Sequence, residues 1–280
     1  MIARTLALPL LMLLMAPCAR AETTLCQEIA SIPTVIATQG VYCLKHNLST
    51  AITSNPAIRI DTNNVTIDCN GHKLGGLAAG NNSMAYGIAA VDRRNITIRN
   101  CSVRGFYRGI ELVGDESGYH VIEDNALDNN LYQAINVTGD GSTIRRNQVR
   151  DTGGSTVSTQ AHGISVSGSA VEVLDNMVDG VVATDNNAVG VLAIVTDGLV
   201  VRGNRIRNLS SGSAEPTFAI NLSLSASAVV IGNTAWASGA MNAYGIDCGG
   251  ATSAARGNTV LDYNDVNGIY ACTELDNHSN

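Results

Sequence analysis

Three side chains, Arg108, Tyr132 and His162, have the types needed to move a proton beside a negatively charged group. An arginine can neutralise a carboxylate, and a histidine or a tyrosine can take a proton as a general base. Arg108 is therefore the candidate cation, and His162 or Tyr132 is the candidate base. Four further polar residues are candidates for binding a substrate beside them: Glu111, Gln133, Asn136 and Ser165. These residues can act together only if distant parts of the chain share one surface.

Internal repeats in the sequence predict such a surface. A small residue followed by Ile or Val recurs from Gly87-Ile88 to Gly268-Ile269, at intervals of 22 to 29 residues. A second element places Asn three positions after an apolar residue and interleaves with the first: Asn70, Asn125, Asn147, Asn176, Asn204, Asn233 and Asn258. The short apolar segments alternate with polar residues and are rich in β-branched side chains, which is typical of strands. The pattern predicts an all-β solenoid of about eight to nine coils that stack at ~4.8 Å and form three parallel sheets.

The solenoid pattern assigns the candidate residues to two rows on the first strand of each coil. The Ile faces the core and the next residue faces outward, which gives an outward row whose members include Glu111, Asn136, Ser165 and Asp247. The residues just before the small residue form the second row, Arg108, Gln133 and His162, over two coil steps of about 10 Å in all.

Carboxylates in the outward row are too far apart for a glycoside hydrolase. Glu111 and Asp247 are five coils apart, about 24 Å at strand spacing. A catalytic carboxylate pair needs roughly 5 to 10 Å between its members. A hydrolase of this kind is therefore the least favoured enzyme class.

The composition agrees with a narrow aliphatic core. The 280 residues include 28 Gly and 27 Asn, with 4% aromatic and 15% charged residues. The low charge content argues against a coiled coil or a disordered acidic tail, and the net charge of −7 argues against a nucleic-acid partner.

Residues 1–21 have the features of a secretory signal peptide: Arg4, an apolar run from Leu6 to Met15, and Ala19-Arg20-Ala21. Lipidation at Cys18 is the alternative, which Pro17 disfavours. Cleavage after Ala21 leaves a chain with no other stretch able to span a membrane. We therefore expect a secreted or periplasmic protein.

The remaining cysteines predict disulfides, because their number is even and export exposes them to an oxidising compartment. They are Cys26, Cys43, Cys69, Cys101, Cys248 and Cys272. Sequential pairing is the simplest of the 15 pairings, and buried free thiols are the alternative. No C-x2-C spacing occurs, so a zinc site is not expected.

Residues 22–54 lie outside the repeat and are expected to cap the first coil, whereas residues 55–280 form the β-helix. The chain continues for eight residues after Cys272. We expect this tail, or self-association with another subunit, to cover the C-terminal end.

The repeats, the Asn positions and the opening Asn63-Asn64-Val65-Thr66-Ile67-Asp68-Cys69-Asn70-Gly71 resemble right-handed parallel β-helix proteins of the pectate-lyase-like group. The resemblance covers roughly residues 55 to 272. It implies a cleft along the first sheet, walled by the loops between the third and first strands. These loops are residues 151–161, 180–188, 208–217 and 235–242. The resemblance does not imply one activity, because lyases, hydrolases, epimerases, esterases and non-catalytic stalks share the fold.

The leading hypothesis is an exported β-helix that engages an extended, acidic polysaccharide along the first sheet, as a lyase or an epimerase. Ala161-His162-Gly163-Ile164-Ser165 resembles the His motif of polygalacturonases, but their upstream Asp pair and Arg-Ile-Lys motif have no counterpart. The Asp-Pro-His-Asp motif of alginate epimerases is also missing, and the Lys residues are Lys45 and Lys73 alone. The alternative is a non-catalytic structural or adhesive β-helix that binds carbohydrate.

No cofactor is predicted. Calcium would need several converging oxygen ligands. The nearest acidic cluster is Glu123, Asp124 and Asp128, which we expect to be solvated turn residues.

Overall fold

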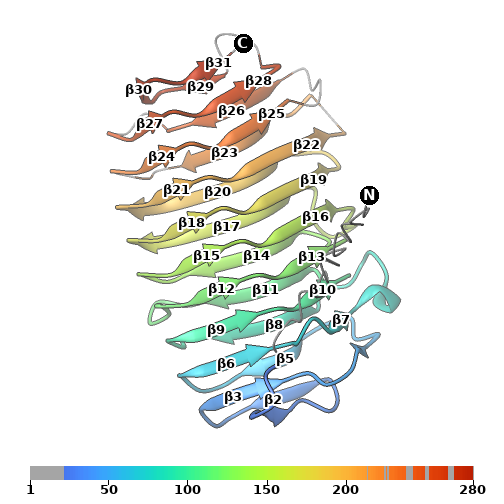
Figure 1. The fold of residues 1–280 in the computed structure, drawn as a ribbon. Helices are drawn as coiled ribbons and strands as arrows, with labels where there is room; N and C mark the ends of the chain where they lie inside the picture. Colours follow the sequence, from blue (N-terminus) through green and yellow to red (C-terminus); the bar gives the residue numbers. More distant parts are fainter. Residues whose placement is uncertain are drawn as a thin grey trace, which may run out of the picture.

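The chain winds as a stack of coils whose strands lie in three parallel sheets (Figure 1). The computed structural model describes residues 22–212, 214–223, 225, 227–237, 242–249, 252–263 and 268–279; the expected signal peptide, residues 1–21, lies outside them. Within the described residues the helical structure is a single turn, η1 (Leu77–Ala79), and no helix is long and apolar enough to cross a membrane.

Each sheet is built from strands of successive coils. The first sheet contains, in spatial order, β2 (Thr34–Ile36), β5 (Pro56–Ile60), β8 (Tyr86–Val91), β11 (Arg108–Val113), β14 (Gln133–Thr138), β17 (Ala161–Ser169), β20 (Ala188–Asp197), β23 (Thr217–Ser223), β26 (Ala243–Asp247) and β29 (Ile269–Tyr270). The second sheet contains β1 (Gln27–Glu28), β3 (Gly40–Cys43), β6 (Val65–Asp68), β9 (Ile96–Arg99), β12 (Val121–Glu123), β15 (Thr143–Arg145), β18 (Glu172–Leu174), β21 (Val200–Arg202), β24 (Val229–Ile231), β27 (Ala254–Arg256) and β30 (Thr273–Leu275). The third sheet contains β4 (Leu48–Ser49), β7 (Lys73–Gly75), β10 (Ser102–Arg104), β13 (Ala126–Asp128), β16 (Gln148–Gly153), β19 (Met177–Ala183), β22 (Arg205–Ser211), β25 (Thr234–Trp236), β28 (Thr259–Leu261) and β31 (His278–Ser279). This arrangement confirms the expected three-sheet solenoid.

Stacked aliphatic side chains fill the interior, as the repeats predict. In the first sheet the fully buried column is Ile88, Ile110, Ile135, Ile164, Val191, Ile220 and Ile246. Each Ile or Val of this column follows a small residue, and at position 163 a residue larger than glycine would clash with its neighbours. A Cβ atom there would lie 2.6 Å from the Gly190 carbonyl oxygen of the next coil and 2.7 Å from the Val178 Cγ1 atom.

A ladder of buried Asn side chains runs along the turn between the second and third sheets. Its rungs are Asn125, Asn147, Asn176, Asn204, Asn233, Asn258 and Asn277, and each amide nitrogen lies 3.0 Å from the amide oxygen of the next rung. Each amide nitrogen also donates to a carbonyl of the preceding coil, as from Asn176 to Ile144 at 2.9 Å. Asn277 extends the predicted ladder by one rung. Asn70 departs from it, because its side chain bonds to Thr23 and Leu44 instead.

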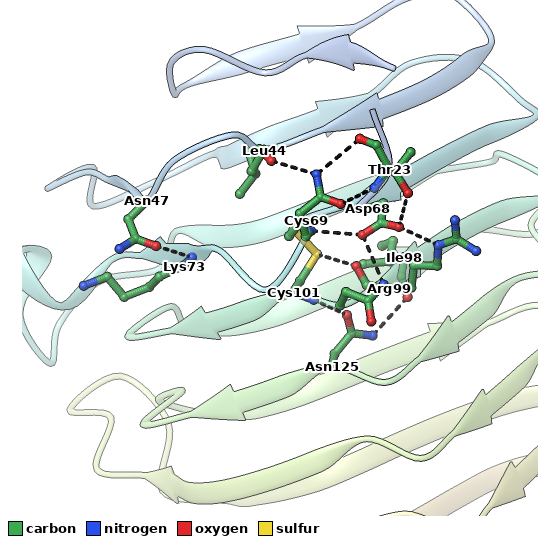
Figure 2. Close-up of a disulfide and its surroundings, with 12 residues drawn as sticks. Thr23, Leu44, Asn47, Asp68, Cys69, Lys73, Ile98, Arg99, Cys101 and Asn125 are labelled. Atoms are coloured by element: carbon green, nitrogen blue, oxygen red, sulfur yellow. Dashed lines mark hydrogen bonds and ion pairs between the residues drawn. A yellow bond between two sulfur atoms is a disulfide. The ribbon is translucent and has the colours of Figure 1, made fainter. Parts of the chain in front are cut away.

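A disulfide stands where the ladder begins (Figure 2). Cys69 pairs with Cys101, and the Cys101 backbone N–H donates to the Asn125 side-chain oxygen at 3.0 Å. The sequential pairing is confirmed, because the other two bridges are Cys26–Cys43 and Cys248–Cys272. The bridges link neighbouring coils near both ends of the stack.

Residues 22–54 contribute β1 to β4 to the three sheets at the N-terminal end of the stack. Their first residues are fixed at Asp68, whose carboxylate accepts from the Thr23 hydroxyl at 2.6 Å and pairs with Arg99 at 2.9 Å (Figure 2). Burial alone would raise the pKa of Asp68, but hydrogen bonds from Thr23, Asn70, Asn100 and Arg99 hold it below its ordinary value.

Removing one rung should destabilise the whole stack. Asn176→Ala leaves the Ile144 carbonyl and two Asn147 donors without their partner. Each orphaned buried group costs about 1–3 kcal/mol, so we expect a loss of at least about 3 kcal/mol in urea unfolding. The control Asn82→Ala alters an exposed loop residue and should stay within about 0.5 kcal/mol of the parent. A loss below about 1 kcal/mol for Asn176→Ala would contradict the assigned role of the ladder.

Candidate functional site

Strand register places the predicted polar residues on one outward face of the first sheet. Arg108 on β11 is opposite Gln133 on β14, which is opposite His162 on β17. The row that begins with Glu111 lies on the same three strands, with Glu111 opposite Asn136 and Asn136 opposite Ser165. The structure therefore brings all of these candidates together. We call this surface the outward face.

Arg108 is already paired with a carboxylate on its own strand. Its Nη1 atom lies 2.5 Å from Glu111 Oε1, and the second carboxylate oxygen accepts from Asn136 Nδ2 at 3.0 Å. The Glu111 side chain is 7% exposed and the Arg108 side chain 23%. Burial raises the pKa of Glu111 above its ordinary value, although Arg108 and Asn136 act in the opposite direction. The guanidinium charge is thus compensated within the protein.

Three tyrosine rings surround the Arg108 guanidinium. Its central carbon lies 5.3 Å from the ring centre of Tyr132 and 5.8 Å from those of Tyr86 and Tyr107. These distances are within the range of cation–π attraction. The rings of Tyr107 and Tyr132 also contact each other, with centres 5.0 Å apart. Tyr107 was not among the sequence candidates, although it directly precedes Arg108 as Tyr132 directly precedes Gln133.

His162 is a buried neutral ring at neutral pH. It is 6% exposed, and burial, aided by the Arg108 charge, lowers its pKa to about 4. Its Nδ1 atom lies 3.1 Å from Gln133 Nε2, and its ring centre is 5.4 Å from that of Tyr132. Donation by the Gln133 amide to Nδ1 leaves the ring proton on Nε2. In this arrangement the ring has no free lone pair with which to accept a proton.

A loop forms a wall beside the tyrosines. The segment between β16 and β17 reaches back to the segment before β8, where the Thr156 N–H donates to the Asn81 carbonyl at 3.0 Å. The two segments belong to coils three steps apart, about 14 Å at strand spacing. The long loop 151–161 therefore runs along the solenoid axis.

A second aromatic group occupies the C-terminal part of the outward face. The rings of Phe218 on β23 and Tyr244 on β26 stack with centres 5.0 Å apart, and Tyr270 on β29 meets Tyr244 edge-on at 6.2 Å. Tyr270 is 51% exposed. Tyr244 and Tyr270 can contact a ligand that lies along the sheet, whereas Phe218 is only 8% exposed and packs behind Tyr244.

A serine–histidine pair on another side of the stack was missed by the sequence analysis. Ser117 Oγ lies 2.8 Å from His120 Nε2, and His120 Nδ1 accepts from the Ile96 backbone N–H at 3.3 Å. The proton of the neutral ring is therefore on Nε2 and points at the serine oxygen. This pair holds a turn in place and does not activate Ser117 as a nucleophile.

The acidic cluster considered for calcium is engaged by arginines. Glu123 pairs with Arg145 and Arg146, while Asp124 pairs with Arg146 and Asp128 with Arg104. In the described parts of the chain, no group of three or more His, Cys, Asp or Glu side chains could hold a metal ion.

Two surface hollows lie away from the outward face. One, of about 500 Å³, is lined by residues of the turn between the second and third sheets, including Asn100 and Arg146. The other, of about 300 Å³, is lined by residues at the ends of first-sheet strands and in the turns after them, including Arg94 and Tyr119.

A sequence profile described as the right-handed beta helix region matches residues 39–206. The chain belongs to this family. No curated protein matches the sequence.

Solved structures with the same β-helix fold have low sequence identity to the chain. They include the Dettilon tailspike protein (TM-score 0.52, 14% identity, 88% of this chain and 59% of that one) and pectate lyase Pel9A (0.51, 12%, 87% and 71%). A DFA-IIIase variant from Arthrobacter chlorophenolicus has a TM-score of 0.50 at 13% identity, over 88% of this chain and 57% of that one. The β-helix thus spans less than two thirds of the tailspike, and these similarities establish the fold alone.

Burial of neutral His162 should make stability depend on pH. Its pKa of about 4 lies below the ordinary 6.5, so between these values the unfolded chain binds more protons. Its contribution is complete above about pH 6.5 and is lost as the pH falls towards 4, at about 1.4 kcal/mol per pKa unit.

Urea unfolding at several pH values should show a shallower loss for His162→Gln than for the parent. His120, whose pKa burial also lowers to about 4, is present in both proteins, so the difference isolates His162. Identical pH slopes would contradict the buried neutral state.

Proposed function

We propose that this β-helix binds an extended polysaccharide along its outward face. The observation that carries the proposal is the location of the aromatic residues. Six of the eleven in the chain lie on, or directly before, first-sheet strands: Tyr86, Tyr107, Tyr132, Phe218, Tyr244 and Tyr270. Aromatic rings offer flat apolar surfaces with polar edges, which suits the faces and hydroxyl groups of sugars.

The spacing of the two aromatic groups supports a long ligand. Arg108 and its tyrosines are on β11 and neighbouring coils, whereas Tyr270 is six coils further on. At strand spacing this is about 29 Å. A single sugar cannot reach both groups, but an extended oligosaccharide can.

The proposed setting is outside the cytoplasm. Three disulfides are typical of proteins that fold in an oxidising compartment. Together with the signal-peptide pattern of residues 1–21, they support a secreted or periplasmic location.

Lyase or epimerase activity on an acidic polysaccharide is the second candidate. One solved structure of this fold is by name a pectate lyase, so the fold is compatible with such an activity. The proximity of Arg108, Tyr132 and His162 favours it, since removal of a proton beside a carboxylate needs a cation and a base. The Arg108–Glu111 pair and the burial of His162 oppose it. Binding without reaction is therefore the better supported function.

The two candidates differ in an assay of uronate polymers. β-Elimination creates an unsaturated product that absorbs ultraviolet light. Product formation that is lost in both Arg108→Ala and His162→Ala would establish the lyase. Binding without product formation supports the first proposal.

Substitution of aromatic residues should weaken polysaccharide binding. We expect Tyr132→Ala and Tyr244→Ala each to reduce affinity roughly ten-fold in titration calorimetry, because each loses one stacking surface. The control Tyr119→Ala removes a 61%-exposed tyrosine away from the outward face and should bind as the parent does. Equal affinities for all four proteins would contradict binding along the first sheet.

A further inference from the structure

The Arg108–Glu111 pair places a protein carboxylate where an acidic sugar would need to bind. One Glu111 oxygen contacts the guanidinium and the other accepts from Asn136. A substrate carboxylate at Arg108 competes with Glu111 for the same positive charge, and a ligand that displaced Glu111 would leave a 7%-exposed anion without its cation. An uncompensated buried charge is strongly destabilising. The site therefore opposes acidic ligands at its most basic point.

Charge along the rest of the outward face has the same effect. Arg59, which lies on β5 two strands before Glu111, pairs with Asp61 at 2.8 Å. Asp247, at the other end of the face, adds a carboxylate. The expected wall loops 151–161, 180–188 and 208–217 contain Asp151, Asp185 and Glu215 but no Lys or Arg. A polyanion would meet balanced or negative charge over its whole length, and like charges repel it.

Two buried polar atoms at the site are suited to a hydroxyl group. Arg108 Nε, a donor, and Gln133 Oε1, an acceptor, have no hydrogen-bond partner in the structure. They belong to residues that are opposite each other on β11 and β14. A hydroxyl both accepts and donates, whereas a carboxylate only accepts. A hydroxyl group can accept from Arg108 Nε or donate to Gln133 Oε1, whereas a carboxylate can only accept from Arg108 Nε.

We infer that the outward face selects uncharged sugars, and that Glu111 is the residue that excludes acidic ones. This inference rests on the proposed polysaccharide binding and names its ligand class. Glu111 acts by neutralising Arg108, so that the tyrosines and amides around it contact hydroxyl-bearing rings. The acidic polymer expected from the sequence is replaced by a neutral one.

The test compares sugars that differ only in charge. The probes are hexasaccharides of glucose, mannose and galactose, each with a counterpart in which every C6 hydroxymethyl group is oxidised to a carboxylate. Affinities for the mature chain are measured by titration calorimetry in one buffer at neutral pH. We expect a neutral hexasaccharide to bind at least about ten-fold more tightly than its oxidised counterpart.

Glu111→Gln removes the blocking charge while keeping the shape of the side chain. This variant should shift the neutral-to-oxidised affinity ratio at least about ten-fold towards the oxidised sugar, since Arg108 becomes available to a ligand carboxylate. Glu172→Gln makes the same charge change on an exposed residue of the second sheet and should keep the parent ratio.

Two outcomes separate the inference from the function on which it rests. Tighter binding of the oxidised sugars by the parent chain would overturn the inference and leave polysaccharide binding intact. Failure of every probe to bind would overturn both. A thermal melt would reveal whether Glu111→Gln folds. If it does not, the neutral-to-oxidised affinity ratio of the parent chain still tests the inference.

Discussion

Hydrogen bonding between buried Asn side chains of successive coils fixes the register on which the rest of this molecule depends. Parallel strands alone allow one coil to slip against the next, because backbone donors and acceptors repeat at every second residue. A buried amide has no such freedom. Its nitrogen must donate to a carbonyl of the preceding coil and to the amide oxygen of the next coil, and its oxygen must accept from the preceding coil, as in the contacts of Asn176. Each rung thus sets the alignment of three strands at once.

Register of this kind turns positions far apart in sequence into neighbours. Arg108, Gln133 and His162 are aligned on three adjacent strands because these strands pair in register. The same stacking explains why Gln133 and His162 are buried although they project away from the core. Side chains of neighbouring coils cover one another at ~4.8 Å spacing. An outward row on a solenoid is therefore a packed layer with the electrostatics of a partly buried site.

Periodicity in the sequence was sufficient to predict the rows but not the contacts within them. The spacing of Ile positions predicts which residues face outward, and the structure agrees for Glu111, Asn136 and Ser165. The ion pair between Arg108 and Glu111 was not predicted, because the two residues were assigned to separate rows and roles. A row assignment says nothing about the side-chain conformations that bring their charged atoms to 2.5 Å. That single contact is the basis on which we infer exclusion of an anion where the sequence predicted its capture.

Irregular parts of the coils account for the other differences. Asn70 matches the ladder pattern in sequence, yet the turn after β6 carries a disulfide at this point, and the amide bonds to Thr23 and Leu44 instead. Tyr107 lies in the turn before β11. The alternation of side chains along a strand does not predict which way a turn residue points. The sequence did contain a signal for Tyr107. It directly precedes Arg108, just as Tyr132 directly precedes Gln133 in the next coil.

A crystal structure of the protein with a bound neutral hexasaccharide would show whether a sugar chain lies along the first sheet. We expect sugar rings that follow the solenoid axis and contact Tyr132 at one end and Tyr244 and Tyr270 at the other. Sugar bound instead in the hollow beside Asn100 and Arg146, or in the one beside Tyr119, would contradict it.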